Sequence, residues 1–156
     1  MVADALSIPL IAAGGIGNGR SMLAAMALGA DAVQIGSRFV ASEESSAHQN
    51  FKDKVVETPE GGTMLSLKSL TPVRLIKNDF FNEVQEAEER GASDEELAEI
   101  LGRGRLMLGM FEGDLSQGEL EIGQISGNIN EIRPAADIVK EIMEEFRAEQ
   151  KRLSSL

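Results

Sequence analysis

The chain has 156 residues, of which 42% are hydrophobic and 26% charged, an ordinary composition for one globular domain with its own core. Fifteen basic against 26 acidic residues give a formal charge of −11, which opposes binding to nucleic acid or to an anionic membrane surface. The absence of cysteine excludes disulfides, thiolate metal ligands and cysteine nucleophiles. No stretch approaches the ~20 apolar residues of a membrane span, so we expect a cytoplasmic protein without nucleic-acid or membrane partners.

The first forty residues predict a compact βαβ unit. The apolar runs at 10–13 and 32–35 are continuous rather than alternating, which is typical of parallel strands covered on both faces. Between them, residues 20–28 carry apolar side chains at helical spacing, with Asn18 as the expected N-cap and Gly29 as the expected stop.

Each predicted strand ends in a glycine loop, at Gly14 and Gly15 after the first strand and at Gly36 and Ser37 after the second. Glycine removes a side chain, so backbone N–H groups can approach an anion such as phosphate directly. The hydroxyl of Ser37 adds a further donor. Gln34 is a polar residue in an apolar strand, and burying its amide unpaired would cost a few kcal/mol. We therefore expect Gln34 to pair near the ligand or with a neighbouring barrel residue.

Spacing separates three nucleotide-site templates. The dinucleotide fingerprint fails, because Arg20 stands in its sixth position when Gly15 and Gly17 take the first and third. Residues 14–21 approach the P-loop pattern, but an arginine replaces the required lysine and the second loop stays unexplained. A barrel phosphate site uses the loops after two successive late strands and explains both loops. We expect the positive end of the helix from Arg20 to assist it.

These residues resemble those of a known family. Residues 8–16 and 29–39 are similar to the C-terminal part of the nitronate monooxygenase (2-nitropropane dioxygenase) family, FMN enzymes on a TIM barrel to which flavin-type enoyl-acyl-carrier-protein reductases are related. Looser matches lie at 47–52, 72–78 and 123–127. The resemblance implies an α/β fold, namely a C-terminal fragment of a TIM (β/α)₈ barrel with about its last two strands, a helical insertion and a C-terminal helix. The alternative is a small complete α/β domain.

The resemblance also implies a function. FMN would be the cofactor, bound through Gly14, Gly15, Gln34, Gly36 and Ser37, and alkyl nitronates would be oxidised with O₂. The related reaction is reduction of an enoyl thioester with NAD(P)H. The family's base is a histidine on an earlier loop without a counterpart here, so we assign no catalytic residue and expect the isolated chain to be inactive. A third hypothesis is a non-catalytic remnant that forms homo-oligomers through an exposed barrel edge.

Three regions of one incomplete domain are expected. Residues 1–57 would hold the last two βα units, 58–122 a mainly helical insertion, and 123–156 a glycine-punctuated segment and an amphipathic barrel helix that Pro134 opens. Eight acidic residues and one basic residue fall within 83–101, which predicts a solvated helical face rather than a metal site.

Further elements follow from local patterns. Residues 42–56 predict a helix, and we expect its His48, the only histidine, to have a surface or packing role rather than that of a base. Residues 63–68 predict a short strand in an edge hairpin or extended segment. Ser93 with Glu96 predicts a capping box at the start of another helix.

Several residues keep two interpretations. Arg38 would pair with phosphate or with an acid such as Glu43 or Glu44. Arg74 or Lys77 would steer an anionic ligand or merely flank a buried strand or turn. The Met-rich stretch at 102–113 predicts short helical pieces, and we expect core packing rather than the lining of a substrate tunnel. The resemblance implies that residues 123–127 lie over the flavin edge.

Overall fold

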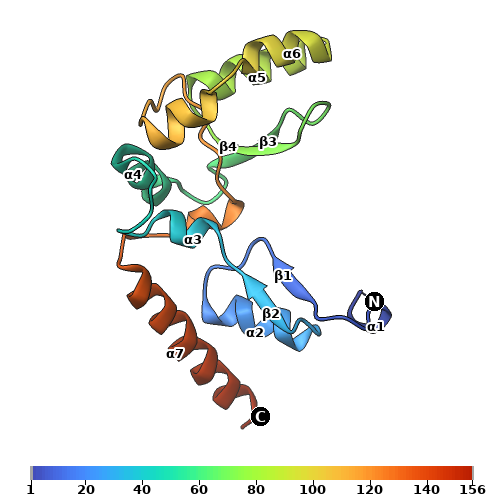
Figure 1. Cartoon of the computed structure of the whole chain (residues 1–156), viewed down its shortest axis with the longest axis vertical. Helices are drawn as coiled ribbons and strands as arrows, with labels where there is room; N and C mark the ends of the chain where they lie inside the picture. Colours follow the sequence, from blue (N-terminus) through green and yellow to red (C-terminus); the bar gives the residue numbers. More distant parts are fainter. Residues whose placement is uncertain (1, 156) are drawn as a thin grey trace.

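The computed structural model describes residues 2–155 and shows two parts joined at the middle of the molecule (Figure 1). In chain order the elements are α1 (Val2–Ala5), β1 (Ile11–Ala13), α2 (Gly19–Ala27), β2 (Ala32–Gln34), α3 (Ser37–Val40), α4 (Gln49–Glu57), β3 (Thr63–Ser66), β4 (Val73–Ile76), α5 (Asp79–Glu89), α6 (Asp94–Leu101), the π-helical η1 (Met107–Phe111), the 3₁₀-helical η2 (Gln124–Asn128) and α7 (Ala135–Leu153). One part holds β1, α2, β2 and α7, and the other holds the β3–β4 hairpin with α5, α6 and η1.

The predicted βαβ unit is confirmed. β1 and β2 form a two-stranded parallel sheet that starts with Ile11 opposite Ala32, and α2 connects the two strands. The side chain of Asn18 caps α2 by accepting a hydrogen bond from the Ser21 amide at 2.9 Å. The local pattern was sufficient here because strand, cap and helix each depend on near neighbours in the chain.

The expected burial of both faces of these strands is wrong for this chain. Ile11 is 59% exposed, and Ala13, Ala32 and Gln34 are exposed as well. Among residues 2–155 the two strands pair only with each other, and they do not close a barrel. The described elements therefore leave apolar side chains of both strands exposed to solvent.

Helix α7 packs on the start of α2 at Gly19. A side-chain carbon at Gly19 would collide with the backbone nitrogen of Phe146 and the carbonyl oxygen of Ile142. The two helices therefore touch at the level of their backbones. Ile138 and Ile142 of α7 are buried, and the helix follows Pro134 as the sequence predicted.

The β3–β4 hairpin has a closed core of its own. The hairpin is antiparallel, with Thr63 opposite Ile76. Its strands, α5 and α6 share a cluster of buried side chains from Leu67, Leu75, Phe80, Phe81, Val84, Ala87 and Leu97. The predicted strand at 63–68 is confirmed as β3, and Ser93 caps α6 through the Glu96 amide at 3.3 Å. The region 58–122 thus contains a hairpin as well as the expected helices.

A second core lies around α4, between the two parts. It contains Ala41, Phe51, Val55, Ile76, Leu120, Ile122 and Ile129. The helix predicted at 42–56 begins only at Gln49, because the preceding residues are held by tertiary contacts. Ser42 forms an isolated parallel β-bridge with Arg133 through the backbone, and the His48 amide donates to the Met110 carbonyl at 2.8 Å.

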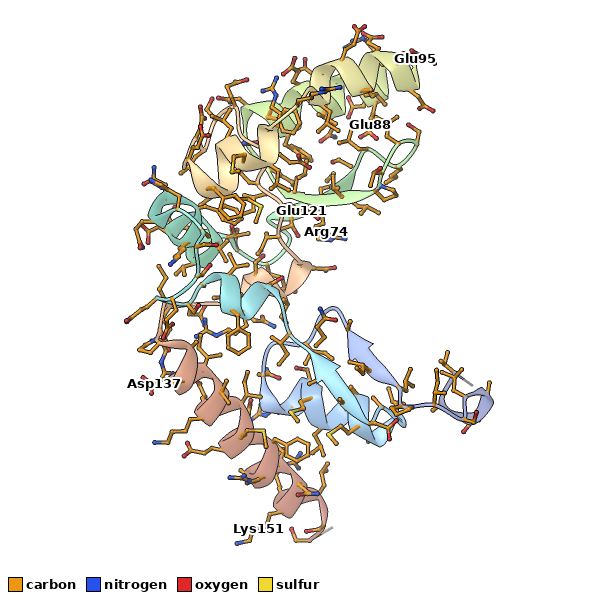
Figure 2. The ribbon with its side chains drawn as sticks, viewed as in Figure 1. Arg74, Glu88, Glu95, Glu121, Asp137 and Lys151 are labelled. Atoms are coloured by element: carbon orange, nitrogen blue, oxygen red, sulfur yellow. The ribbon has the colours of Figure 1, made fainter. Side chains whose placement is uncertain are left out.

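The Met-rich stretch forms core only in part, because Met110 packs against the core around α4 while its neighbours are exposed. Its short helical piece is η1, in which Met107 is 54% and Phe111 40% exposed. The acidic stretch is solvated as predicted, and Figure 2 shows Glu88 and Glu95 at the outer end of α5 and α6. Within residues 2–155, no helix combines the length and apolar character that crossing a membrane requires.

Candidate functional site

The two glycine loops meet where β1 and β2 end, around a hollow of about 250 Å³. All five residues that the sequence singled out line it, namely Gly14, Gly15, Gln34, Gly36 and Ser37, together with Gly123 and Ile125. The parallel pairing of the strands explains this convergence, since both chains leave the sheet at the same edge.

Three of these glycines leave open space in front of their backbone. A side-chain carbon added at Gly14, Gly15 or Gly36 would meet no heavy atom within 4 Å. Gly14 and Gly15 also have φ angles of +91° and +69°, in the region that other residues rarely adopt. Gly36 has a φ of −105°, so only the space in front of it argues for glycine there. Such bare backbone is suited to approach by an anion.

Sequence reasoning missed a hydrogen bond that reaches the hollow from far along the chain. The Gly123 amide donates to the Ser37 hydroxyl oxygen at 3.1 Å, across 86 residues of sequence. Gly123 precedes η2, which the sequence placed over the cofactor only through the family resemblance. No local pattern connects the two residues, because the contact depends on how β4 guides the returning chain.

The expected help from the positive end of α2 is not available in this arrangement. Glu145 of α7 accepts a hydrogen bond from the Gly19 amide at 2.7 Å, and Ser21 accepts from the amides of Gly17 and Asn18 at 3.2 Å. Arg20 turns outward to Glu149 of α7, at 3.2 Å. Protein groups therefore already satisfy the start of α2, and the carboxylate of Glu145 occupies the place that a bound anion would take.

Gln34 does not need the buried partner that the sequence predicted. It lies at the end of β2 on the rim of the hollow and is exposed. Among the described residues no hydrogen bond involves its side chain, so its amide remains free to bond water or a ligand.

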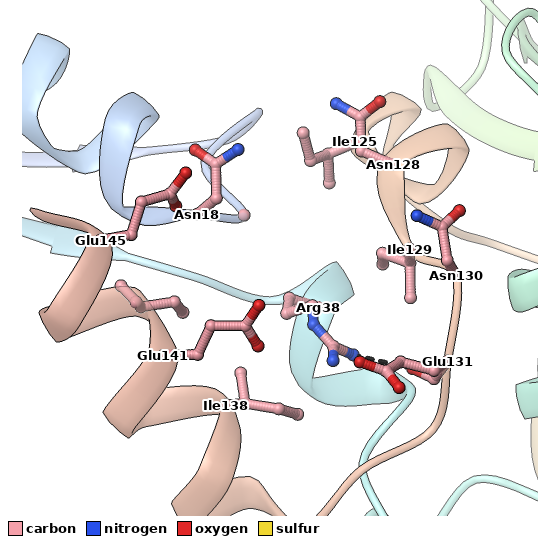
Figure 3. A pocket seen from close by; sticks show the side chains of 12 residues that line it. Asn18, Arg38, Ile125, Asn128, Ile129, Asn130, Glu131, Ile138, Glu141 and Glu145 are labelled. Atoms are coloured by element: carbon pink, nitrogen blue, oxygen red, sulfur yellow. Dashed lines mark hydrogen bonds between the residues drawn. The ribbon is translucent and has the colours of Figure 1, made fainter. Parts of the chain in front are cut away.

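Arg38 lines a different cavity, of about 400 Å³, between α7, α3 and the segment around η2 (Figure 3). Its guanidinium donates to the backbone carbonyls of Glu131 at 3.2 Å and Ala41 at 3.4 Å. Burial lowers the pKa of Arg38, while the negative charges of Glu141 and Glu131 oppose that shift. Arg38 therefore ties α3 to the chain before α7, and it meets neither of its two predicted roles.

Two other polar candidates have structural partners. Arg74 donates across the hairpin to the carbonyl of Thr63 at 3.2 Å and to its hydroxyl at 3.3 Å, which favours the strand-flanking interpretation (Figure 2). His48 caps α4, its Nδ1 accepting from the Asn50 amide at 3.1 Å, and it does not line the hollow. A packing role for His48, as expected, is consistent with these contacts.

A parallel βα pair with two glycine loops around one hollow is an arrangement typical of anion-binding sites in α/β proteins. Comparison with known proteins identifies the family. The model of the nitronate monooxygenase family matches residues 1–145, so the chain belongs to this family of flavin-dependent oxidoreductases. The chain is 46% identical over 87 residues to a probable nitronate monooxygenase of Bacillus subtilis, and 39% identical over 84 residues to one of Staphylococcus saprophyticus.

Solved structures extend the likeness to almost the whole chain. FabK of Thermotoga maritima is 40% identical with a TM-score of 0.91, and the match covers 99% of this chain and 49% of FabK. A nitroalkane oxidase of Streptomyces ansochromogenes is 29% identical with a TM-score of 0.75, over 97% of this chain and 43% of the oxidase. The chain spans about half of these structures, and its matches to the Bacillus and Staphylococcus proteins cover 55% and 53% of it but only 25% and 24% of them.

Proposed function

We propose that this chain forms the FMN-phosphate cradle of a nitronate monooxygenase that oxidises alkyl nitronates with O₂. The observation that carries the proposal is the convergence of both glycine loops on one hollow, with open space in front of Gly14, Gly15 and Gly36. A phosphate there would receive backbone N–H donors without any lysine, together with the hydroxyl of Ser37. Membership of a flavin-dependent family supports FMN as the source of that phosphate.

The residues of this chain would bind and orient the cofactor rather than carry out proton transfer. When bound, FMN supplies the redox chemistry, and the protein supplies binding and electrostatics. His48 is the only histidine, and it is held as the cap of α4 away from the hollow. We therefore assign no catalytic base to the chain.

Reduction of an enoyl thioester with NAD(P)H is the second candidate. The observation that favours it is the likeness to FabK, an enoyl-acyl-carrier-protein reductase, at a TM-score of 0.91 over nearly the whole chain. The two reactions are separated by assaying the longest natural polypeptide that contains this sequence. Oxygen consumption with propyl-2-nitronate supports the first, and NADH oxidation that depends on an enoyl thioester supports the second.

The cradle itself is tested by titrating the chain with FMN and following flavin fluorescence. Gly36→Val should abolish binding while leaving the fold intact, because its φ is ordinary and the new side chain fills only the open space. Gly15→Val should also abolish binding, although its positive φ adds strain.

Gly91→Val is the matched control for Gly15→Val. Gly91 has a φ of +77° and open space like Gly15, but it lies between α5 and α6, outside the hollow. It should therefore show similar strain and unchanged FMN binding. Retention of FMN affinity by both Gly15→Val and Gly36→Val would contradict the assignment of the cradle.

A further inference from the structure

The hydrogen bond between Gly123 and Ser37 determines where the Ser37 hydroxyl proton can go. A serine hydroxyl has one proton and two lone pairs. One lone pair of Ser37 accepts from the Gly123 amide at 3.1 Å. Within residues 2–155, the Ser37 hydroxyl donates to no protein acceptor. Its proton is therefore left for a group inside the hollow that both residues line.

The Gly123 amide is itself held from both sides. The preceding amide, of Ile122, donates to the carbonyl of Arg74 in β4 at 3.1 Å. The carbonyl of Gly123 accepts from the Ser126 amide in η2 at 3.0 Å. The donor to Ser37 is thus fixed before any ligand arrives, which removes the cost of ordering it on binding.

Position 123 also has to be glycine for this contact. A side-chain carbon there would lie 2.6 Å from the hydroxyl oxygen of Ser37, well inside van der Waals contact. Even alanine would push the hydroxyl away or displace the segment from it.

We propose that Gly123 is a positioning residue of the phosphate cradle, whose backbone N–H holds the Ser37 hydroxyl with its proton directed at a phosphate oxygen. This inference rests on the proposed function, since it takes the hollow to be the phosphate site. Ser37 touches the ligand, and Gly123 acts through Ser37. The segment at Ile122 and Gly123, which β4 holds through the Arg74 carbonyl, thereby contributes to a site built mainly from β1 and β2.

The test compares FMN with riboflavin, which carries the same ring system and ribityl chain without the phosphate. Dissociation constants of both are measured by flavin fluorescence for the chain and for Ser37→Ala, Gly123→Ala and the double variant. A hydrogen bond to a charged group predicts that each single change weakens FMN by at least tenfold. Riboflavin affinity should stay within threefold, and the double variant should bind FMN no more weakly than the weaker single variant.

Two further variants separate positioning from general packing. Ser37→Thr keeps the hydroxyl and should restore FMN affinity to within threefold. Ser126 lies on the neighbouring turn, η2, and its buried hydroxyl has no hydrogen-bond partner among the described residues. Ser126→Ala should therefore leave FMN affinity unchanged. If Gly123→Ala does not fold, NMR gives the same information. The Gly123 amide signal of the unaltered chain should shift on addition of FMN, and this shift should be lost in Ser37→Ala.

The outcomes distinguish the two proposals. If the unaltered chain binds FMN no more tightly than riboflavin, the phosphate cradle is wrong and the positioning role falls with it. If FMN binds more tightly and Gly36→Val removes the difference, the cradle stands. In that case, three results for Gly123→Ala would overturn the role of Gly123. The variant could leave FMN affinity unchanged, it could weaken riboflavin and FMN equally, or its loss of FMN binding free energy could add fully to that of Ser37→Ala.

Discussion

The two parts of the molecule in Figure 1 differ in how completely their strands and apolar residues are covered. In the hairpin part, Phe80 and Phe81 of α5 are almost completely buried in the core that this helix shares with β4 and α6. In the strand part, Ile8 and Ile11 are largely exposed, and the two strands pair only with each other within residues 2–155. A hairpin and the helices after it can cover one another locally, whereas barrel strands need partners on both edges and both faces.

The comparison also separates stability from function. The proposed cradle lies in the strand part, and the segment that returns from the hairpin part lines it with Gly123 and Ile125. The region with the closed core would therefore stabilise the chain, and the region with open edges would carry the ligand. Four predictions test this division, from the largest effect to the smallest.

The largest effect concerns assembly. Unpaired strand edges and exposed apolar side chains favour association, so we predict that the chain at micromolar concentration has a mass in solution well above 16.7 kDa. Ile11→Lys places a charge on the open sheet and should shift the protein toward monomer. Size exclusion with light scattering measures both. A clean monomer with a sharp unfolding transition would show that the strand part needs no partner.

The second prediction sets one core position against one open position. Phe81→Ala should lower the free energy of unfolding by ~3–5 kcal/mol, because it leaves a cavity in a closed core. Ile11→Ala should change it by ~0.5 kcal/mol or less. Urea denaturation at a fixed low protein concentration measures the difference. A cost above ~2 kcal/mol for Ile11→Ala would mean that the face of β1 is covered in solution.

The third prediction concerns the contact that holds α7 to the strand part. Gly19→Ala should cost ~1–3 kcal/mol, because its side chain would collide with the backbone of α7, which moves only as a unit. Gly36→Ala is the control, since neither glycine has a positive φ and Gly36 faces open space. Equal effects of the two changes on the urea midpoint would show that α7 does not pack at Gly19.

The smallest effect concerns Glu119, a buried carboxyl in the chain that returns to the cradle. Burial, and then the charge of Glu121, raises its pKa above the ordinary value of 4.5. The folded state then holds this proton more tightly than the unfolded state, so stability is greater at low pH and falls as pH rises from 4.5 through the raised value.

Glu119→Gln should therefore stabilise the protein at pH 7, by up to ~1 kcal/mol, and remove this part of the pH dependence. Urea midpoints measured from pH 4 to pH 7 give both quantities. Exposed Glu121→Gln serves as the control and should have a smaller effect. A loss of stability in Glu119→Gln at neutral pH would show that its charge is compensated in the folded state.

The amino-acid sequence by itself determined the strand–helix–strand order, the Asn18 cap, the two glycine loops and the helix after Pro134. Each of these depends on residues a few positions apart, where hydrophobic period, capping and backbone freedom act. The convergence of Gly14, Gly15, Gly36 and Ser37 also followed, because successive parallel strands end at the same edge.

Only the tertiary structure decided which groups meet at long range. Gly19 bonds Glu145 across 126 residues, and Ser37 bonds Gly123 across 86. Neither pairing has a local pattern, and the first one overturned the expected role of the α2 N-terminus. The open edge of the strand pair followed from the expected barrel fragment. Which side chains stay exposed, such as Ile11, was decided by the tertiary structure, because an apolar run shows that cover is needed and says nothing about where the covering residues lie.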